Sequence, residues 1–167
     1  KKNDPFIVQQ MKRAAKIADV GPMAAVAGAV SAAVGTALLK ESQEVIVENG
    51  GDLFIKTNIE RRVAIDAGKS AFKDLGILVK GQTNSFGICT SSGTMGHSLS
   101  FGKADVATVI SEDVYLADAA ATALGNRVMT HMDIKEAINW AKKIDGIKGI
   151  LIIVDNRMGA FGEIELG

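Results

Sequence analysis

The chain has 167 residues, of which 47% are apolar and only 5% aromatic, so the core of a single domain must consist mainly of Ala, Val, Ile and Leu. Lys and Arg number 19, as do Asp and Glu, so no basic field favours nucleic acid as a partner. The single cysteine, Cys89, excludes an internal disulfide and favours a cytoplasmic location. Because the chain begins Lys1-Lys2, we expect an N-terminal piece to be missing.

The N-terminal part predicts two helices. Asp4-Pro5 is typical of a helix start, and apolar residues then recur at helical spacing as far as Ala18. Gly21-Pro22 ends this helix and opens a second, from Met23 to about Lys40. The segment from Gly21 to Leu39 is uncharged, but its many Ala and Gly residues favour a helix buried against a sheet over a membrane span.

The rest of the chain alternates short apolar runs with turns. Asn49-Gly50-Gly51-Asp52 predicts a hairpin turn. Two more helices are expected, Val114 to Leu124 closed by Gly125-Asn126, and Ile134 to Ile144 capped by Asp133. The expected strands are 44–48, 53–56, 62–67, 76–80, 86–90, 104–110, 150–154 and an edge strand 162–166. Strands in runs, with helices grouped at both ends, predict an α+β fold with a mixed or antiparallel sheet, in one domain over residues 1–167.

Asp118 and Thr122 are the first candidate functional pair. They lie four residues apart, hence on one face of the predicted helix. A carboxylate and a hydroxyl are hard oxygen ligands that suit Mg²⁺ or Ca²⁺ better than zinc. Because this spacing is common, the residues alone favour an ordinary helix surface over a metal site.

A second candidate region is rich in hydroxyls and backbone N–H groups. Thr90-Ser91-Ser92-Gly93 follows a predicted strand and could cradle an anion, although a plain polar turn fits equally well. His97 could contact a phosphate or a ring carbonyl. The glycines at 50 and 51 allow a flat ligand to approach the backbone, with a simple hairpin turn as the alternative. Cys89 could pair with His97, but a buried free cysteine is usually inert, and we expect no catalysis by it.

Four blocks of the sequence resemble the uncharacterised UPF family of ApbE-like proteins. They occur in that family's order and cover about residues 4 to 155. The blocks are Gly21–Gly28, Val47–Asp52, Gly87–Thr94 with Gly96–Ser98, and Ala117–Asn126.

Through that family the chain is similar to ApbE, which uses FAD and Mg²⁺ to attach FMN to a threonine of a target protein. The resemblance implies an ApbE-like fold, and it places Asp118 and Thr122 at the metal-holding positions of an A-D-x-x-x-T motif. It also implies that a backbone carbonyl near Val26-Ala27-Gly28 contacts the metal. The cofactor-binding residues that it implies are Gly50, Gly51, Asp52, Thr90, Ser91, Ser92, Gly93 and His97.

We therefore expect a protein that binds a small phosphorylated or flavin ligand (FAD or FMN) with Mg²⁺, with FMN transfer from FAD as the reaction if it is an enzyme. The alternative is a non-catalytic ligand-binding or structural module in a homo-oligomer. Two differences from ApbE favour the alternative: Ala27 stands where ApbE has Lys, and Ser98–Gly102 stands where ApbE has D-P-x-T-G. Neither nucleic acid nor a membrane is an expected partner.

Overall fold

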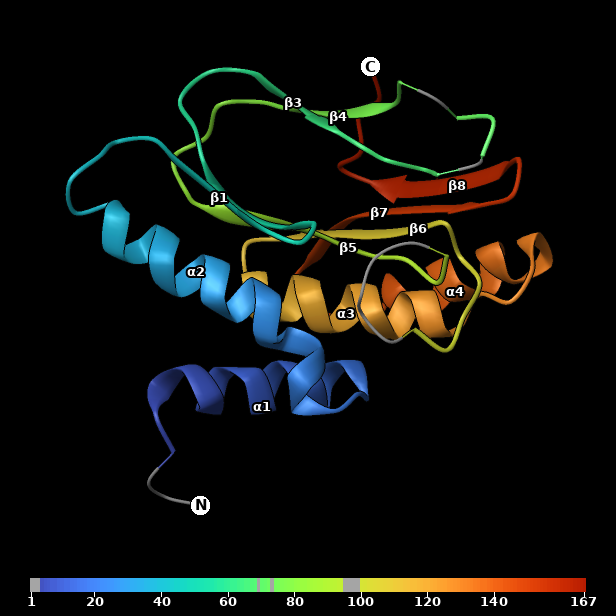
Figure 1. Ribbon diagram of the computed structural model, residues 1–167, viewed down its shortest axis with the longest axis horizontal. Coiled ribbons are helices and arrows are strands. Elements are labelled where there is room, and N and C mark those ends of the chain that lie inside the picture. The colour runs from blue at the N-terminus through green and yellow to red at the C-terminus, as the bar shows by residue number, and fades with distance from the viewer. Residues whose placement is uncertain (1–3, 69, 73, 95–99) are drawn as a thin grey trace.

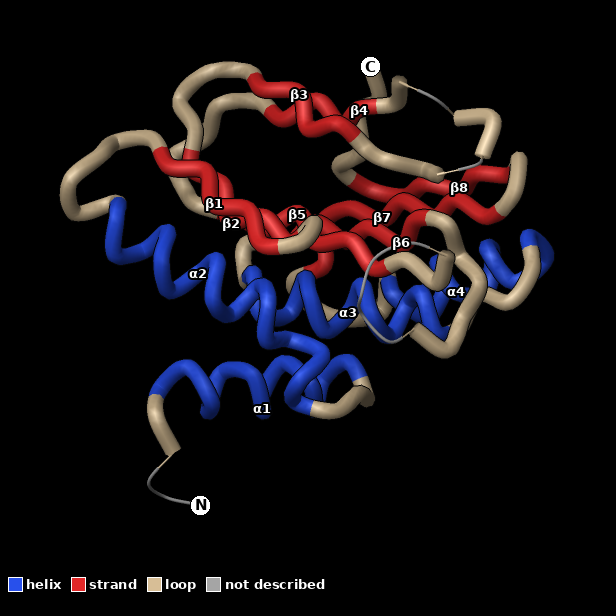
Figure 2. The backbone as a smooth tube through the Cα atoms, viewed as in Figure 1, coloured by secondary structure: helices blue, strands red, loops and turns tan. Residues whose placement is uncertain are grey.

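The computed structural model describes residues 4–68, 70–72, 74–94 and 100–167. A six-stranded sheet forms the middle layer, with a two-stranded hairpin on one face and helices on the other (Figure 1). One of these helices, α1 (Phe6–Ala18), packs on α3 (Val114–Asn126) and lies on the side of α3 away from the sheet (Figure 2). The predicted α+β class is confirmed.

Every strand pairing among the described residues is antiparallel. In the large sheet the order is β1-β2-β5-β6-β7-β8, and β3 pairs with β4 in the hairpin. Asn49 opposes Asp52 in the β1–β2 hairpin, which confirms the predicted turn. The strands are β1 (Val45–Asn49), β2 (Asp52–Lys56), β3 (Arg61–Ala64), β4 (Gly76–Val79), β5 (Phe86–Ser91), β6 (Val106–Ser111), β7 (Ile147–Val154) and β8 (Arg157–Gly162).

The second predicted helix is divided in two. A 3-10 turn, η1 (Pro22–Ala25), leads into α2 (Val26–Leu38). The expected burial holds for one face of α2 only. The buried residues are Gly28, Ala29, Ser31, Ala32 and Gly35, whereas the exposed apolar ones include Val26, Val30, Val34 and Leu38.

Two of the predicted helix ends are wrong. Gly125 and Asn126 belong to α3, whose C-cap is Arg127 in the right-handed region, because the chain leaves the helix without a left-handed residue. Asp133 makes no side-chain cap for α4 (Ile134–Ala141). Its carboxylate instead accepts from the N–H groups of Met129 and Thr130 and caps the short turn η2 (His131–Asp133).

The predicted edge strand 162–166 is also wrong, since the edge strand is β8, which ends at Gly162 with φ +76°. Residues beyond it turn back toward β4, where Leu78 N–H donates to the carbonyl of Glu165 at 2.8 Å. The sequence did not predict β8, because apolar and polar residues alternate only weakly along it. Gly159 and Gly162 have no side chains that could be buried on one face of a strand.

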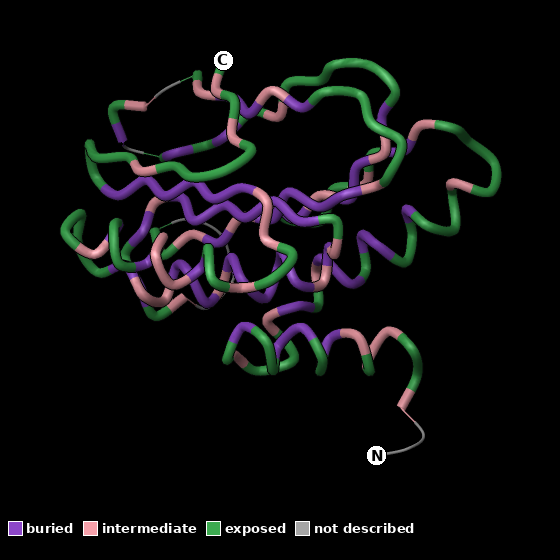
Figure 3. The backbone as a smooth tube through the Cα atoms, turned by 180° about the vertical axis from the view of Figure 1, so that it is seen from behind, coloured by how far each residue is buried: buried purple, intermediate pink, exposed green. Residues whose placement is uncertain are grey.

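The sheet separates two hydrophobic cores. The core on the helix side is built largely of Ala and Val, with Phe54 and Leu124 among its larger members. The core on the hairpin side is richer in Ile, for example Ile55 and Ile88. Figure 3 shows buried residues along the sheet strands and on the helices, with exposed residues in the outer loops.

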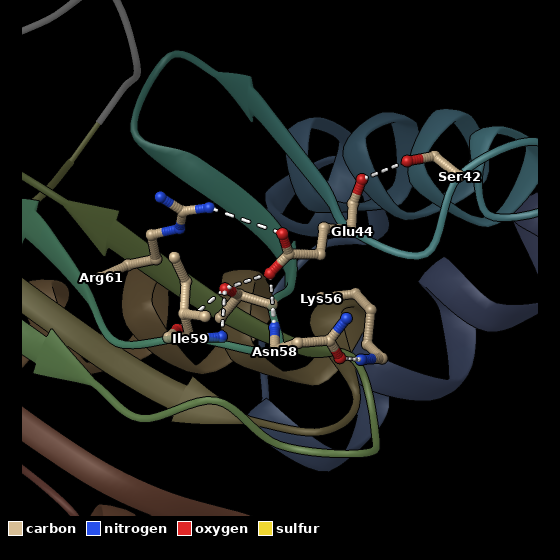
Figure 4. A network of polar contacts seen from close by, with 7 residues as sticks. Ser42, Glu44, Lys56, Asn58, Ile59 and Arg61 are labelled. Atoms are coloured by element: carbon tan, nitrogen blue, oxygen red, sulfur yellow. Dashed lines mark hydrogen bonds and ion pairs between the residues drawn. The ribbon is translucent and has the colours of Figure 1, made fainter.

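A polar network fixes the hairpin relative to the sheet (Figure 4). The Glu44 carboxylate, just before β1, accepts from the N–H of Asn58 at 2.6 Å and from the Thr57 hydroxyl at 3.0 Å. It also forms an ion pair with Arg61 at 3.6 Å. The hydrogen bond from Asn58 is the first of the causes that lower the pKa of Glu44. The network thus ties the start of β3 to the start of β1.

Within the described residues, no single helix is both long and apolar enough to cross a membrane, although α1 and the segment Pro22–Leu38, bent by 107°, would meet that test together by length and composition alone.

The cap of α3 provides a test of what holds the helix layer together. Asp113 accepts from the N–H of Leu116 at 3.2 Å and forms an ion pair with Arg13 of α1 at 2.5 Å. Asp113→Ala should lower the free energy of unfolding by about 1–2 kcal/mol, because it removes the cap. Asp113→Ser keeps a capping oxygen and Arg13→Ala removes only a surface ion pair, so each should cost less than about 1 kcal/mol. Urea denaturation measures the free energy of unfolding of each variant. Equal losses of stability in all three would show that the Asp113 cap does not stabilise α3.

A buried carboxylate pair at the junction of two cavities

The site begins where α2 crosses α3. The N–H of Gly28 donates to Asp118 Oδ2 at 2.8 Å. A Cβ at position 28 would lie 2.8 Å from Asp118 Cβ and 3.0 Å from the carbonyl oxygen of Val114. Glycine is therefore required for this approach of the two helices, and the approach leaves Asp118 only 7% exposed.

The second carboxylate comes from the start of β2. Gly50 (φ +63°) and Gly51 (φ +100°) form the turn that leads into Asp52. Asp52 shares the helix-facing side of its strand with Phe54, and its carbonyl accepts from the Ser31 hydroxyl of α2 at 2.8 Å. Asp52 is 8% exposed, and its Oδ1 is the buried side-chain oxygen without a hydrogen-bond partner in the part of the chain that the structure describes.

The environment raises the pKa of both carboxyl groups. Burial, followed by the nearby charge of Asp118, raises the pKa of Asp52 to about 8. Burial raises the pKa of Asp118 to about 6, against the effect of the N–H groups of Gly28 and Ala27. Cys89 opposes Asp52 in the β2–β5 register. It is fully buried, and burial together with these two acids raises the pKa of its thiol, which makes it a poor nucleophile.

Thr122 completes the cluster, one helical turn after Asp118 on α3. Asp52, Asp118 and Thr122 line two cavities at once. The larger, of about 740 Å³, lies between β3 and the β1–β2–β5 part of the sheet, and it includes Arg61, Arg62 and the Gly50–Gly51 turn. The smaller, of about 610 Å³, is bounded by the η1 region, Phe101 and Asn126.

The hydroxyl-rich segment Thr90–Gly93 begins at the same cavity, but its first two residues belong to a strand and not to a turn. Thr90 and Ser91 are the last residues of β5 and, with Ser92, line the larger cavity. The N–H of Thr90 donates to Gly51 O at 3.2 Å and that of Gly93 to Ala104 O at 2.8 Å, so these two N–H groups are used within the fold. His97 lies outside the described residues.

Two arginines of the cavity were not among the predicted site residues. Arg61 and Arg62 open β3, a strand that the sequence pattern predicts only from Arg62 onward. Arg62 donates to backbone carbonyls of Gly167 and Asp74, while Arg61 is 42% exposed at its side chain. Two adjacent basic residues before a strand are too common a signal to mark a site.

The fold and the site together define a class of α+β protein in which two buried carboxylates meet at the junction of two cavities. The sequence matches the family model described as AbpE bacteria over residues 1–166. A UPF0280 protein of Methanosarcina acetivorans is 43% identical over 164 residues, which are 97% of this chain and 65% of the relative. One of Methanothrix thermoacetophila is 44% identical over 163 residues, 97% and 68% of the two chains. The chain thus spans about two thirds of the length of these relatives, and it belongs to the UPF0280 family.

The carboxylate pair makes stability depend on pH. Because the folded pKa values of Asp52 and Asp118 exceed the ordinary carboxyl value, the folded state holds extra protons between about pH 4 and pH 8. Stability is greatest at the acidic end of that window and falls as the pH rises, by about 1.4 kcal/mol per pH unit for each extra proton held. With a chelator present, the melting temperature should be lower at pH 8 than at pH 5. Asp52→Asn should flatten the profile, and a flat wild-type profile would contradict the prediction.

Gly28 can be tested by size. Gly28→Leu should destabilise the protein by about 1–3 kcal/mol, since the added side chain must enter the α2–α3 contact. Gly21→Leu is the matched control, because a Cβ at Gly21 meets no described atom within 4 Å, and its effect should stay within about 0.5 kcal/mol. The melting temperatures of the two variants, measured by thermal denaturation, test this prediction. Equal values would show that position 28 is not closely packed.

Proposed function

We propose that this chain binds a small phosphorylated ligand, a nucleotide or a flavin nucleotide, together with Mg²⁺ at Asp118 and Thr122. The observation that carries the proposal is the junction itself, where a buried carboxylate and a hydroxyl face two cavities large enough for the two halves of such a ligand. The residues fit the ion chemically. Mg²⁺ prefers oxygen ligands and takes only one or two protein carboxylates, and a buried Asp52 oxygen beside Asp118 lacks a partner among the described residues.

The larger cavity offers the charge that phosphates need. Arg61 lines it with a side chain that is 42% exposed and also forms an ion pair with Glu44, and Ser91 and Ser92 are among the other lining residues. Arginine suits phosphate because its planar donors can form two parallel hydrogen bonds. The smaller cavity is lined largely by apolar and small residues, which suits a ring more than a phosphate.

The reaction that we propose is transfer of FMN from FAD to a hydroxyl group of an acceptor, and the similarity to ApbE supports it. The bond between the FMN phosphorus and the bridging pyrophosphate oxygen breaks, a phosphoester to the acceptor oxygen forms, and AMP leaves while the hydroxyl proton is released to solvent. When bound, Mg²⁺ supplies positive charge that polarises the pyrophosphate and stabilises the developing negative charge. Asp118 and Thr122 hold the ion, and Arg61 orients the phosphate. The single cysteine supports a cytoplasmic location.

A non-catalytic module in a homo-oligomer is the second candidate. The exposed stripe Val26, Val30, Val34 and Leu38 on α2 favours it, because four apolar side chains one helical turn apart form a patch that another subunit could cover. Ala27, in place of the ApbE lysine, also favours binding without turnover. Size-exclusion chromatography and release of AMP from FAD separate the two candidates.

Metal dependence is tested with three variants. Asp118→Asn should weaken Mg²⁺-dependent binding of FAD, because it removes the negative charge that a hard cation needs while keeping the side-chain shape. Thr122→Val should have a smaller effect, since a neutral hydroxyl contributes less. Asp145→Asn is the control, because Asp145 is an exposed carboxylate outside the lining of both cavities, and this variant should bind FAD as the wild type does.

The measurement is calorimetry with FAD and with AMP, in Mg²⁺ and in chelator. Equal affinities for wild type and Asp118→Asn under both conditions would exclude metal-assisted binding and leave the metal-free binding module. An enzyme should in addition lose turnover of FAD to AMP in Asp118→Asn.

A further inference from the structure

Asp52 carries a buried carboxylate with one oxygen that no described residue binds. The Gly50–Gly51 turn and the hydrogen bond from Ser31 to its carbonyl hold its backbone against α2. The residue is 8% exposed, and its Oδ1 has no hydrogen-bond partner among the described residues. A buried polar atom left without a partner costs about 1–3 kcal/mol, so this oxygen destabilises the protein as long as nothing binds it.

We propose that Asp52 would serve as a second carboxylate ligand of the divalent cation, beside Asp118. The inference rests on the proposed cation site and adds to it a residue from a different layer of the fold. The ion would then join β2 to α3, and it would neutralise two charges that otherwise face each other across the junction.

One carboxylate oxygen at the junction is held by a hydrogen bond, and another has no partner among the described residues. Asp118 Oδ2 is used by the N–H of Gly28, which fixes the orientation of that carboxylate. Asp52 Oδ1 is left over on the neighbouring strand. Both residues, with Thr122, border the same two cavities, so one ion at their junction would face ligand on either side.

The charges also favour a dication. Of the ion pairs formed between described residues, none includes Asp52 or Asp118. Two carboxylates and one hydroxyl match the charge and the hard oxygen chemistry of Mg²⁺ or Mn²⁺.

The test measures cation binding without the organic ligand. Mn²⁺ is titrated into the chelator-treated protein, and free Mn²⁺ is followed by its paramagnetic resonance signal. Asp52→Asn and Asp118→Asn should each weaken Mn²⁺ binding at least about tenfold, whereas Asp145→Asn, an exposed position outside both cavities, should bind like the wild type. Asp52→Asn with wild-type Mn²⁺ affinity would overturn the inference, as would a wild type that binds no Mn²⁺ at millimolar concentration.

Thermal stability gives a second readout. At about one hundred times the Kd, MgCl2 should raise the wild-type melting temperature by roughly 5–10 °C, and a tenfold weaker site should give about half that rise. Without cation, Asp52→Asn should melt at or above the wild-type temperature, which shows that the variant folds. If it does not fold, Asp52→Ser is used in its place, because it also removes the carboxylate.

The two proposals fail separately. Mn²⁺ binding that depends on Asp52, in a protein that binds neither FAD nor AMP, supports this inference and contradicts the proposed ligand. FAD binding that requires Mg²⁺ but is the same in Asp52→Asn contradicts this inference and supports the proposed function.

Discussion

The burial of two carboxylates in one place is the constraint on which the rest of the site depends. Asp118 can be buried because Gly28 has no side chain, so that α2 approaches α3 closely enough to donate its N–H group. Asp52 is brought to the same point by a turn of two glycines with positive φ. Each carboxylate is costly by itself, and nearby like charge raises the cost of the pair. A fold built for stability alone would not contain this pair.

The helix layer and the hairpin layer contribute opposite charge to one cavity. The acidic pair reaches it from α3 and the start of β2, while Arg61 and Arg62 reach it from β3. Glu44 determines where β3 lies, because its carboxylate binds the β2–β3 connection and the Arg61 guanidinium together. A ligand with a negative phosphate and a bound cation would therefore meet a complementary surface on both sides. Glu44 lies at the end of the β1–β2 pair opposite to Asp52, yet its contacts position the cationic side of the cavity.

Local patterns predicted most of the fold. Asn49-Gly50-Gly51-Asp52 predicted its hairpin because glycine alone readily supplies the two positive φ angles, and the apolar runs predicted seven of the strands within a few residues. Gly125 was wrongly predicted to end α3, because a glycine can also continue a helix. Asp133 was wrongly predicted to cap α4, because an aspartate can also cap a neighbouring turn. Asp118 and Thr122 were predicted as a site from the resemblance of their motif, and the structure shows that both line the two cavities. The unpartnered oxygen of Asp52 and the position of Arg61 at the cavity depend on packing between segments distant in sequence, so no local pattern could indicate them.

The hydrogen bond between Gly28 and Asp118 spans 90 positions of the chain. Translation adds about 5–20 residues per second, so on the order of 5–20 seconds separate the synthesis of its two partners. Until α3 is synthesised, α2 lacks the helix against which Gly28 packs, and part of its uncharged small-residue face stays uncovered. Ribosome-bound intermediates of this length should therefore be the stage at which the protein most needs a chaperone.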